Sequence, residues 1–269
     1  MNVLIVTVLA PHSASGVISY YNRLAQDLEN QGITVCVIDS SHTPFLWRKF
    51  LGIIRRIMPV FGSAGRASYE EFANFTAIYI AAIGKRKEKP DLIHAQDASS
   101  GAATYLAMGR KIPVVMSCHF NDDPASEIAA RFSLGDWSRN RLTQWYTHLF
   151  SYTKNYVFSS NYVYNKSKHL LPVNVNKLII YNTVSDTFTT VAENRDMSSK
   201  LTISNVGYFD ERKNQKLLIQ IADELRKRGI TNFVIWLIGD GPKRAECEQL
   251  VNDLNLTGQA GLSHEIGKD

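Results

Sequence analysis

The sequence has few cysteines, no long hydrophobic run and no glycine-rich dinucleotide motif, and each absence removes a class of protein. Its three cysteines lie far apart in the chain, without the spacing of a zinc site or a disulfide framework: Cys36, Cys118 and Cys247. This usage is typical of a reduced, cytoplasmic protein. No apolar run is long enough to span a bilayer, and the apolar N-terminus lacks the cationic start of a signal peptide.

The loop after the first apolar run also argues against a nicotinamide-dependent dehydrogenase. Residues 10–16 read APHSASG, which is not the GxGxxG pattern. Asp39 is the lone acidic residue at the end of the second apolar run, where such enzymes hold a ribose.

What the sequence does contain is the balance of a globular protein with a sizeable core. Of its 269 residues, 45% are hydrophobic and 20% are charged. The net charge of +5 and the pI near 9.0 favour an anionic partner, which leaves a nucleotide, a lipid headgroup or a nucleic acid open.

Short apolar runs alternate with helical patterns along the chain, and this alternation predicts an α/β fold with parallel sheets. Apolar runs without polar alternation, typical of buried parallel strands, occupy residues 3–9, 35–38, 92–97, 112–119 and 156–160. We expect a first domain over 1–185, a polar linker over 186–200 and a second domain over 201–269. The tail from residue 260 shows no strand pattern, so only two strands are expected in the second domain.

The most informative stretch is residues 203–242, which reads as strand, basic turn, helix, strand and glycine turn. The first strand ends at Gly207, and the basic turn at 210–214 contains Arg212 and Lys213. The second strand ends at the turn Gly239-Asp240-Gly241. Both turns fall at the carboxyl ends of parallel strands, the edge at which open α/β sheets bind ligands.

Written as VGYFDERKNQ and LIGDGP, these two turns closely resemble the donor half of retaining GT-B glycosyltransferases of the family 4 type. The resemblance implies a GT-B-like fold, with a Rossmann-type first domain and an incomplete second one. It implies a nucleotide-sugar donor held by the residues Gly16, Arg212, Lys213, Gly239, Asp240 and Gly241. Lys213 matches the lysine that holds the diphosphate, whereas Tyr208 stands where the family usually has arginine. A fixed cation there stabilises the charge that develops on the leaving nucleoside diphosphate.

The first half of the chain resembles the acceptor domain of the same family. The segment PDLIHAQ at 90–96 is similar to the family's PDvvHaH and contains His94. The resemblance assigns a catalytic role to His119, which faces the sugar being transferred, and an acceptor-side role to His12, His94 and Asn121. It implies no metal or other cofactor and no nucleic-acid partner. Asp122-Asp123 is interpreted as turn and N-cap chemistry.

Residues 45–61 (FLWRKFLGIIRRIMPVF) combine aromatic, aliphatic and cationic side chains at helical spacing. This composition suits a helix lying on an anionic membrane, here the inner face of the cytoplasmic membrane. It also suits an ordinary helix docked on the sheet with a solvated basic face. Both interpretations stay open.

The resemblance stops before the part of the donor domain that carries two glutamates in this family. The leading expectation is therefore a truncated glycosyltransferase that acts on a glycan or lipid-linked acceptor, with activity impaired by the missing segment. The alternative is a non-catalytic acceptor-binding or assembly subunit that needs a partner chain. A nucleotide-sugar epimerase of the same shape is a third alternative, although no convincing carboxylate pair supports it.

Overall fold

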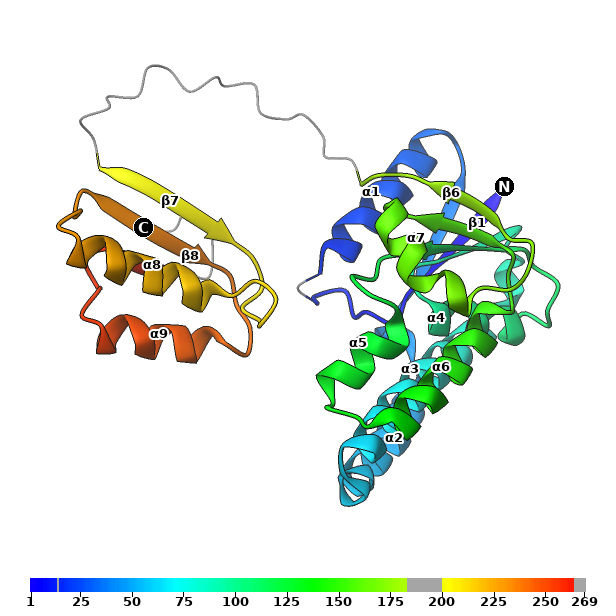
Figure 1. Ribbon diagram of the computed structural model, residues 1–269. Helices are drawn as coiled ribbons and strands as arrows, with labels where there is room; N and C mark the ends of the chain where they lie inside the picture. Colours follow the sequence, from blue (N-terminus) through cyan, green and yellow to red (C-terminus); the bar gives the residue numbers. More distant parts are fainter. Residues whose placement is uncertain (14, 183–199, 264–269) are drawn as a thin grey trace. The chain divides into compact units, whose positions relative to one another are not determined.

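The computed structural model describes residues 1–13, 15–182 and 200–263, and the chain divides into two compact units (Figure 1). The first unit is Met1–Val184 and the second is Ser185–Asp269. The predicted linker at 186–200 lies outside the described residues except for Lys200.

A six-stranded, entirely parallel sheet forms the centre of the first unit, in the order β2-β1-β3-β4-β5-β6. Its strands are β1 (Asn2–Val6), β2 (Thr34–Ile38), β3 (Leu92–Ala95), β4 (Val114–Cys118), β5 (Asn155–Phe158) and β6 (Asn176–Ile179). The strand order reverses direction next to β1. The carboxyl ends of β1 and β3 therefore flank the kind of crevice in which doubly wound folds bind ligands.

Helices cover both faces of this sheet, which explains why its strands are apolar without alternation. The helices of this unit are α1 (Gly16–Asn30), α2 (Phe45–Ile57), α3 (Gly62–Gly84), α4 (Ala98–Ala107), α5 (Pro124–Arg131), α6 (Asp136–Phe150) and α7 (Asn161–Ser167). Four short 3-10 turns complete the unit: η1 (Ser40–His42), η2 (Met58–Phe61), η3 (Arg86–Glu88) and η4 (Lys168–Leu170).

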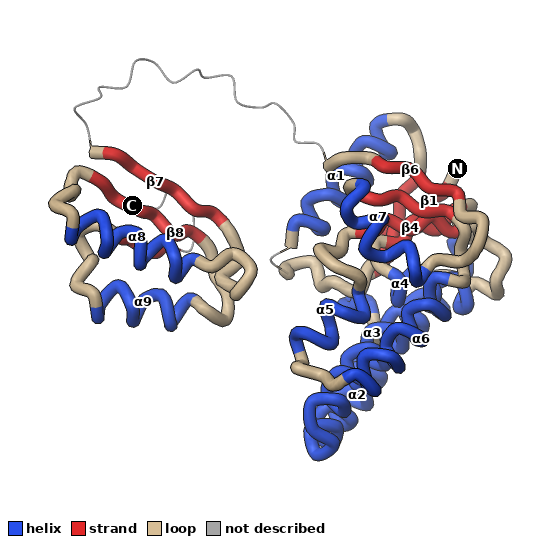
Figure 2. The backbone as a smooth tube through the Cα atoms, in the orientation of Figure 1, coloured by secondary structure: helices blue, strands red, loops and turns tan. Residues whose placement is uncertain are grey.

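The side chains of β1 show how the two faces divide. Val3 and Ile5 are buried against α1, whereas Leu4 and Val6 join the larger core that α3, α4 and α6 build on the opposite face. Figure 2 shows α2, α3 and α6 extending beyond the sheet as a helical projection.

The second unit contains a three-stranded parallel sheet in the order β7-β8-β9, with two helices. Its elements are β7 (Leu201–Val206), α8 (Gln215–Lys227), β8 (Phe233–Ile238), α9 (Arg244–Asp253) and β9 (Ala260–Ser263). The prediction of only two strands was wrong. The third strand is short and contains a glycine, so it shows no pattern in the sequence. Gly261 is nevertheless required there, because a Cβ would lie 2.5 Å from the Trp236 ring.

Candidate active site

Two turns at the carboxyl edge of the second sheet are held directly against each other. The amide of Gly207 donates to the carbonyl of Ile238 at 2.9 Å, and the amide of Phe209 donates to the carbonyl of Asp240 at 2.8 Å. Gly241 has φ 148°, and a Cβ there would lie 2.5 Å from the Phe209 carbonyl oxygen. A Cβ on Gly239 would likewise overlap the Gly207 carbonyl. Of the three predicted donor-site glycines, Gly239 and Gly241 are thus required by the contact between the turns, whatever they bind.

The cations of the basic turn and of the start of α8 differ in whether they already have a carboxylate partner. Arg212 pairs with Asp210 at 3.5 Å, and Lys216 pairs with Glu246 at 2.9 Å. The stem of Lys213 passes along Gly207, with its Cε 3.6 Å from the position a Cβ would take there. Within residues 200–263 no carboxylate pairs with the Lys213 ammonium. Lys213 is therefore the cation of this turn that is available to an anionic ligand.

The first residues of α8 complete this edge. Asn214 adopts the left-handed conformation at φ 49° and makes no side-chain cap on the helix. The amide of Lys213 donates to the Asp210 carboxylate at 2.8 Å, and the Tyr208 carbonyl accepts from the Gln215 side chain at 3.1 Å. The exposed Asp240 carboxylate accepts from the amide of Gly241 at 2.7 Å, which caps its own turn.

In the first unit, His119 follows the last residue of β4 at the carboxyl edge of the larger sheet. Its Nε2 lies 3.0 Å from the amide oxygen of Gln96, and its ring meets the Tyr20 ring edge-on at 4.7 Å. Burial lowers the pKa of His119 to about 4, so the imidazole is neutral at physiological pH. Since an amide oxygen only accepts, Nε2 carries the proton and Nδ1 presents a lone pair.

His94 is directed toward a neighbouring strand. Its Nε2 lies 2.8 Å from the hydroxyl of Ser117 on β4. Burial, followed by the nearby His119, lowers the pKa of His94 to about 4. His94 therefore reads as a neutral histidine that joins two strands beneath the edge.

Asp97 is a residue of this edge that the sequence analysis missed. Its carboxylate accepts from the amides of Val8 at 2.9 Å and Ser100 at 2.7 Å, which ties the loop after β1 to the start of α4. Burial raises the pKa of Asp97, while these hydrogen bonds oppose the rise. The signal was present in the sequence, since an Asp three residues before a Ser at a helix start is a capping pattern.

A pocket of about 360 Å³ opens where the loops after β1, β3 and β4 meet, and we refer to it as the edge pocket. Its lining includes Val8, Asp97, Phe120, Glu127, Glu71 and Tyr146. Carboxyl groups thus gather in a pocket with apolar walls. Such a pocket can accept hydrogen bonds from the hydroxyl groups of a sugar or glycan.

The remaining predicted residues of the first unit lie around this edge without lining the pocket. Gly16 begins α1 behind the cap Ser15, and His12 is exposed in the preceding turn. Asn121 is also exposed, and its amide donates to the Glu127 carboxylate at 2.6 Å. Asp123 caps α5 by accepting from the amide of Ser126, as turn and N-cap chemistry predicted.

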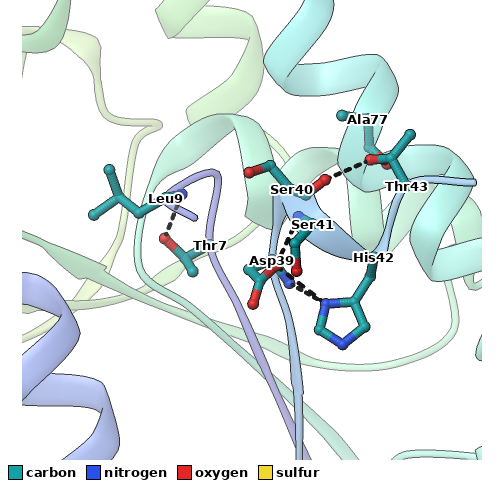
Figure 3. A network of polar contacts seen from close by, with 8 residues as sticks. All are labelled: Thr7, Leu9, Asp39, Ser40, Ser41, His42, Thr43 and Ala77. Carbon is teal, nitrogen blue, oxygen red and sulfur yellow. Dashed lines mark hydrogen bonds and ion pairs between the residues drawn. The ribbon is translucent and has the colours of Figure 1, made fainter. Parts of the chain in front are cut away.

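Asp39 has a structural role, which explains why it is acidic at the end of β2 (Figure 3). It is 3% exposed, and its carboxylate accepts from the amide of Ser41 at 2.7 Å and lies 3.1 Å from His42 Nδ1. One of its carboxylate oxygens is thus engaged as the N-cap of η1. This local role accounts for an acidic residue here without a dinucleotide.

One family model matches more than half of the chain. The family model described as Glycosyltransferase Family 4 matches residues 14–188. No curated protein sequence matches the chain.

Several solved structures share the fold. Sucrose-phosphate synthase from Thermosynechococcus elongatus superposes with a TM-score of 0.69 at 14% identity, covering 98% of this chain and 70% of its own. HepE from Anabaena, solved in complex with UDP and glucose, has a TM-score of 0.63 at 14% identity with the same coverage. WaaG, a glycosyltransferase involved in lipopolysaccharide biosynthesis, has a TM-score of 0.61 at 14% identity, again with the same coverage. At this identity the superpositions establish the fold.

Proposed function

Because the chain belongs to Glycosyltransferase Family 4 and has the GT-B fold, we propose that it transfers a sugar from a nucleotide-sugar to a glycan or lipid-linked acceptor with retention. The observation that carries this proposal is Lys213, a cation without a carboxylate partner in the described residues, on a turn fixed against Gly239-Asp240-Gly241. When the bond between the sugar and the diphosphate breaks, negative charge grows on the leaving oxygen. A fixed ammonium stabilises that charge.

In the proposed reaction the first unit supplies the acceptor side. His119 is neutral and held by Gln96, so its imidazole can exchange a hydrogen bond with a sugar hydroxyl. The edge pocket offers carboxyl oxygens to the hydroxyl groups of an acceptor. The chain spans about 70% of the length of these structural relatives.

We further propose that transfer needs no metal ion. Lys213 would provide the positive charge that a divalent cation provides in other phosphate chemistry.

Donor binding tests the proposal most directly. Isothermal titration calorimetry with UDP, GDP and ADP measures binding of the nucleoside diphosphate. An assay with the matching nucleotide-glucose then measures sugar transfer. We expect at least one diphosphate to bind, and we expect the sugar to keep its anomeric configuration in any product. Failure of all three diphosphates to bind would contradict the proposal.

A specific feature of the second sheet favours the alternative, an assembly subunit completed by a partner chain. The core of this unit lies on one face, where Phe233, Ile235 and Leu237 pack against α8 and α9. Leu201 and Val206 on the edge strand β7 are 59% and 58% exposed. Purification from the native cells distinguishes the assembly subunit from an enzyme that acts alone. A second protein recovered in stoichiometric amount would favour the assembly subunit, whereas an active chain recovered alone would contradict it.

Peripheral membrane contact is a separate proposal, supported by α2. Its side chains Leu46, Phe50, Ile53 and Ile57 recur at helical spacing on one stripe and are 47–77% exposed. Exposed basic residues accompany the stripe: Arg48, Lys49, Arg55 and Arg56. Of the two interpretations of residues 45–61, this exposure favours the helix on an anionic membrane.

Flotation with vesicles tests the membrane contact. We expect binding to phosphatidylglycerol vesicles and weak binding to phosphatidylcholine vesicles, and we expect Ile53→Asp to reduce it. Equal flotation of Ile53→Asp and the unmodified chain would contradict the proposal. The helices of the described residues include no segment long and apolar enough to cross a bilayer.

A further inference from the structure

A groove runs between α3 and α6 on the helical projection, outside the residues assigned above to donor binding. We refer to it as the α3–α6 groove; its volume is about 440 Å³. One wall is made of small side chains on α3, among them Ala64, Ala67 and Ser68. The other wall is made of large side chains on α6, among them Trp137, Leu142 and Trp145. Small residues facing large ones leave an elongated hollow in place of a packed helix seam.

The groove is poor in charge. Its charged lining residues are Glu71 and Arg141, and Arg141 is exposed. Glu71 is only 6% exposed, and its carboxyl accepts from the Trp145 indole at 3.1 Å. Burial raises the pKa of Glu71 to about 7, against the opposing hydrogen bonds from Tyr146 and Trp145. An apolar ligand would thus meet few groups that lose hydration when it binds.

The groove and the edge pocket meet at one residue. Glu71 lines both hollows, and the adjacent Tyr146 lines the edge pocket. From Ala64 to Glu71 the groove follows two turns of α3, about 10 Å at the rise of an α-helix. A ligand that occupies both hollows must therefore be apolar at one end and rich in hydroxyl groups at the other.

We propose that the α3–α6 groove binds the hydrocarbon chain of an amphiphilic acceptor whose hydroxyl-bearing head lies in the edge pocket. The proposal rests on the proposed function for the role of the head. It deepens that function by naming the acceptor class: a lipid or lipid-linked sugar, not a free glycan. The occupant follows from Glu71, the lining residue that the apolar groove shares with the carboxyl-lined pocket, and from the weak charge along the groove.

Quenching of tryptophan fluorescence by brominated dodecyl maltoside, used below its micelle concentration, tests the proposal. Bromine quenches an indole that it touches, and Trp137 and Trp145 both line the groove. We expect saturable quenching that unbrominated dodecyl maltoside reverses and maltose alone does not. We expect Ala64→Phe, which fills the groove, to weaken the apparent affinity about tenfold or more.

Matched variants separate the groove from other apolar surfaces. Ala73→Phe makes the same change on the same helix, but Ala73 lines a different hollow together with Arg55 and Tyr69, so quenching should persist. Trp47→Phe removes the tryptophan of α2, and quenching should persist there too. Unsaturable quenching, equal quenching in Ala64→Phe and the unmodified chain, or loss of quenching in Trp47→Phe alone would overturn the proposal.

Two further controls keep the outcome readable. Circular dichroism and the thermal midpoint establish that each variant folds; if Ala64→Phe does not, Ser68→Leu fills the groove from an exposed position on the same wall. The readout uses no nucleotide and no sugar transfer. A chain that quenches normally but binds no nucleoside diphosphate would therefore refute the proposed function while leaving the groove as a hydrocarbon site.

Discussion

The amide oxygen of Gln96 lies 3.0 Å from Nε2 of His119, so two adjacent strands share one hydrogen bond at the edge of the first sheet. Gln96 stands where the resembled family pattern has a second histidine. A neutral amide acceptor fixes the tautomer of His119 without charging the ring.

Replacing this acceptor by a carboxylate should change the charge of His119. We predict that Gln96→Glu raises the His119 pKa from about 4 by about 1–3 units, because a carboxylate beside the ring favours imidazolium. The measurement is a ¹H–¹⁵N NMR titration of the histidine ring. Asn121→Asp adds the same charge at an exposed position nearby and should leave the His119 pKa where it was.

The unpaired Lys213 should matter for donor binding more than its neighbours do. We predict that Lys213→Ala weakens binding of the preferred nucleoside diphosphate about tenfold or more, since it removes a charge-assisted contact. Lys216→Ala is the matched control, because Lys216 already pairs with Glu246. Titration calorimetry measures both, and equal losses in the two variants would refute the assignment of Lys213.

The contact between the two turns predicts an effect on stability that is independent of any ligand. Gly241→Ala should destabilise the second unit by about 2 kcal/mol or more, because alanine is strained at this φ and its Cβ meets the Phe209 backbone. Gly258→Ala is the comparison, since a Cβ there has no neighbour within 4 Å. Urea unfolding followed by Trp236 fluorescence, in chains whose other three tryptophans are replaced by phenylalanine, distinguishes the variants. Similar urea midpoints for Gly241→Ala and Gly258→Ala would contradict the prediction, because they would show that the contact between the two turns adds little stability.

The buried Glu71 predicts a pH dependence of stability. Because burial raises its pKa from 4.5 to about 7, the folded chain keeps a proton that the unfolded chain releases between these pH values. Stability from this group is therefore present below pH 4.5 and is lost as the pH rises to about 7, by roughly 3 kcal/mol in all.

We predict that Glu71→Gln removes this pH dependence, and that it raises the free energy of unfolding at pH 8 relative to the unmodified chain. The surrounding groups that could mask the effect are Glu70, Asp97, Tyr146 and Trp145. Glu70→Gln is the control, because Glu70 is more exposed and pairs with Arg131. Urea unfolding between pH 4.5 and 8 measures all three chains; parallel curves would contradict the assignment.

The sequence predicted those parts of the fold whose residue pattern depends only on neighbours in the chain. Buried parallel strands such as β1 and β8 are continuous apolar runs, and the Asp123 cap follows from residue type and spacing alone. The contact between the two turns was predictable because both motifs fall at the same sheet edge, whereas donor binding there stays a prediction.

The parts that the sequence did not predict depend on contacts between distant segments. β9 can pair with β8 because Gly261 has no side chain to collide with the Trp236 ring. Residues 260–263 alone contain no pattern that indicates this contact. Asp97 joins the site through the amide of Val8, which is 89 residues earlier in the chain. The α3–α6 groove exists because small residues on one helix face large ones on another, and only the packing brings them together.

The contact of Trp236 with Gly261 has a practical consequence. The chain has four tryptophans, and Trp236 is the one in the second unit, on the central strand of its sheet. Its indole rests on bare backbone of β9, so detachment of that strand would hydrate the ring and shift its emission to the red. In a chain whose other three tryptophans are replaced by phenylalanine, Trp236 is thus an intrinsic optical reporter for the closure of the smaller sheet.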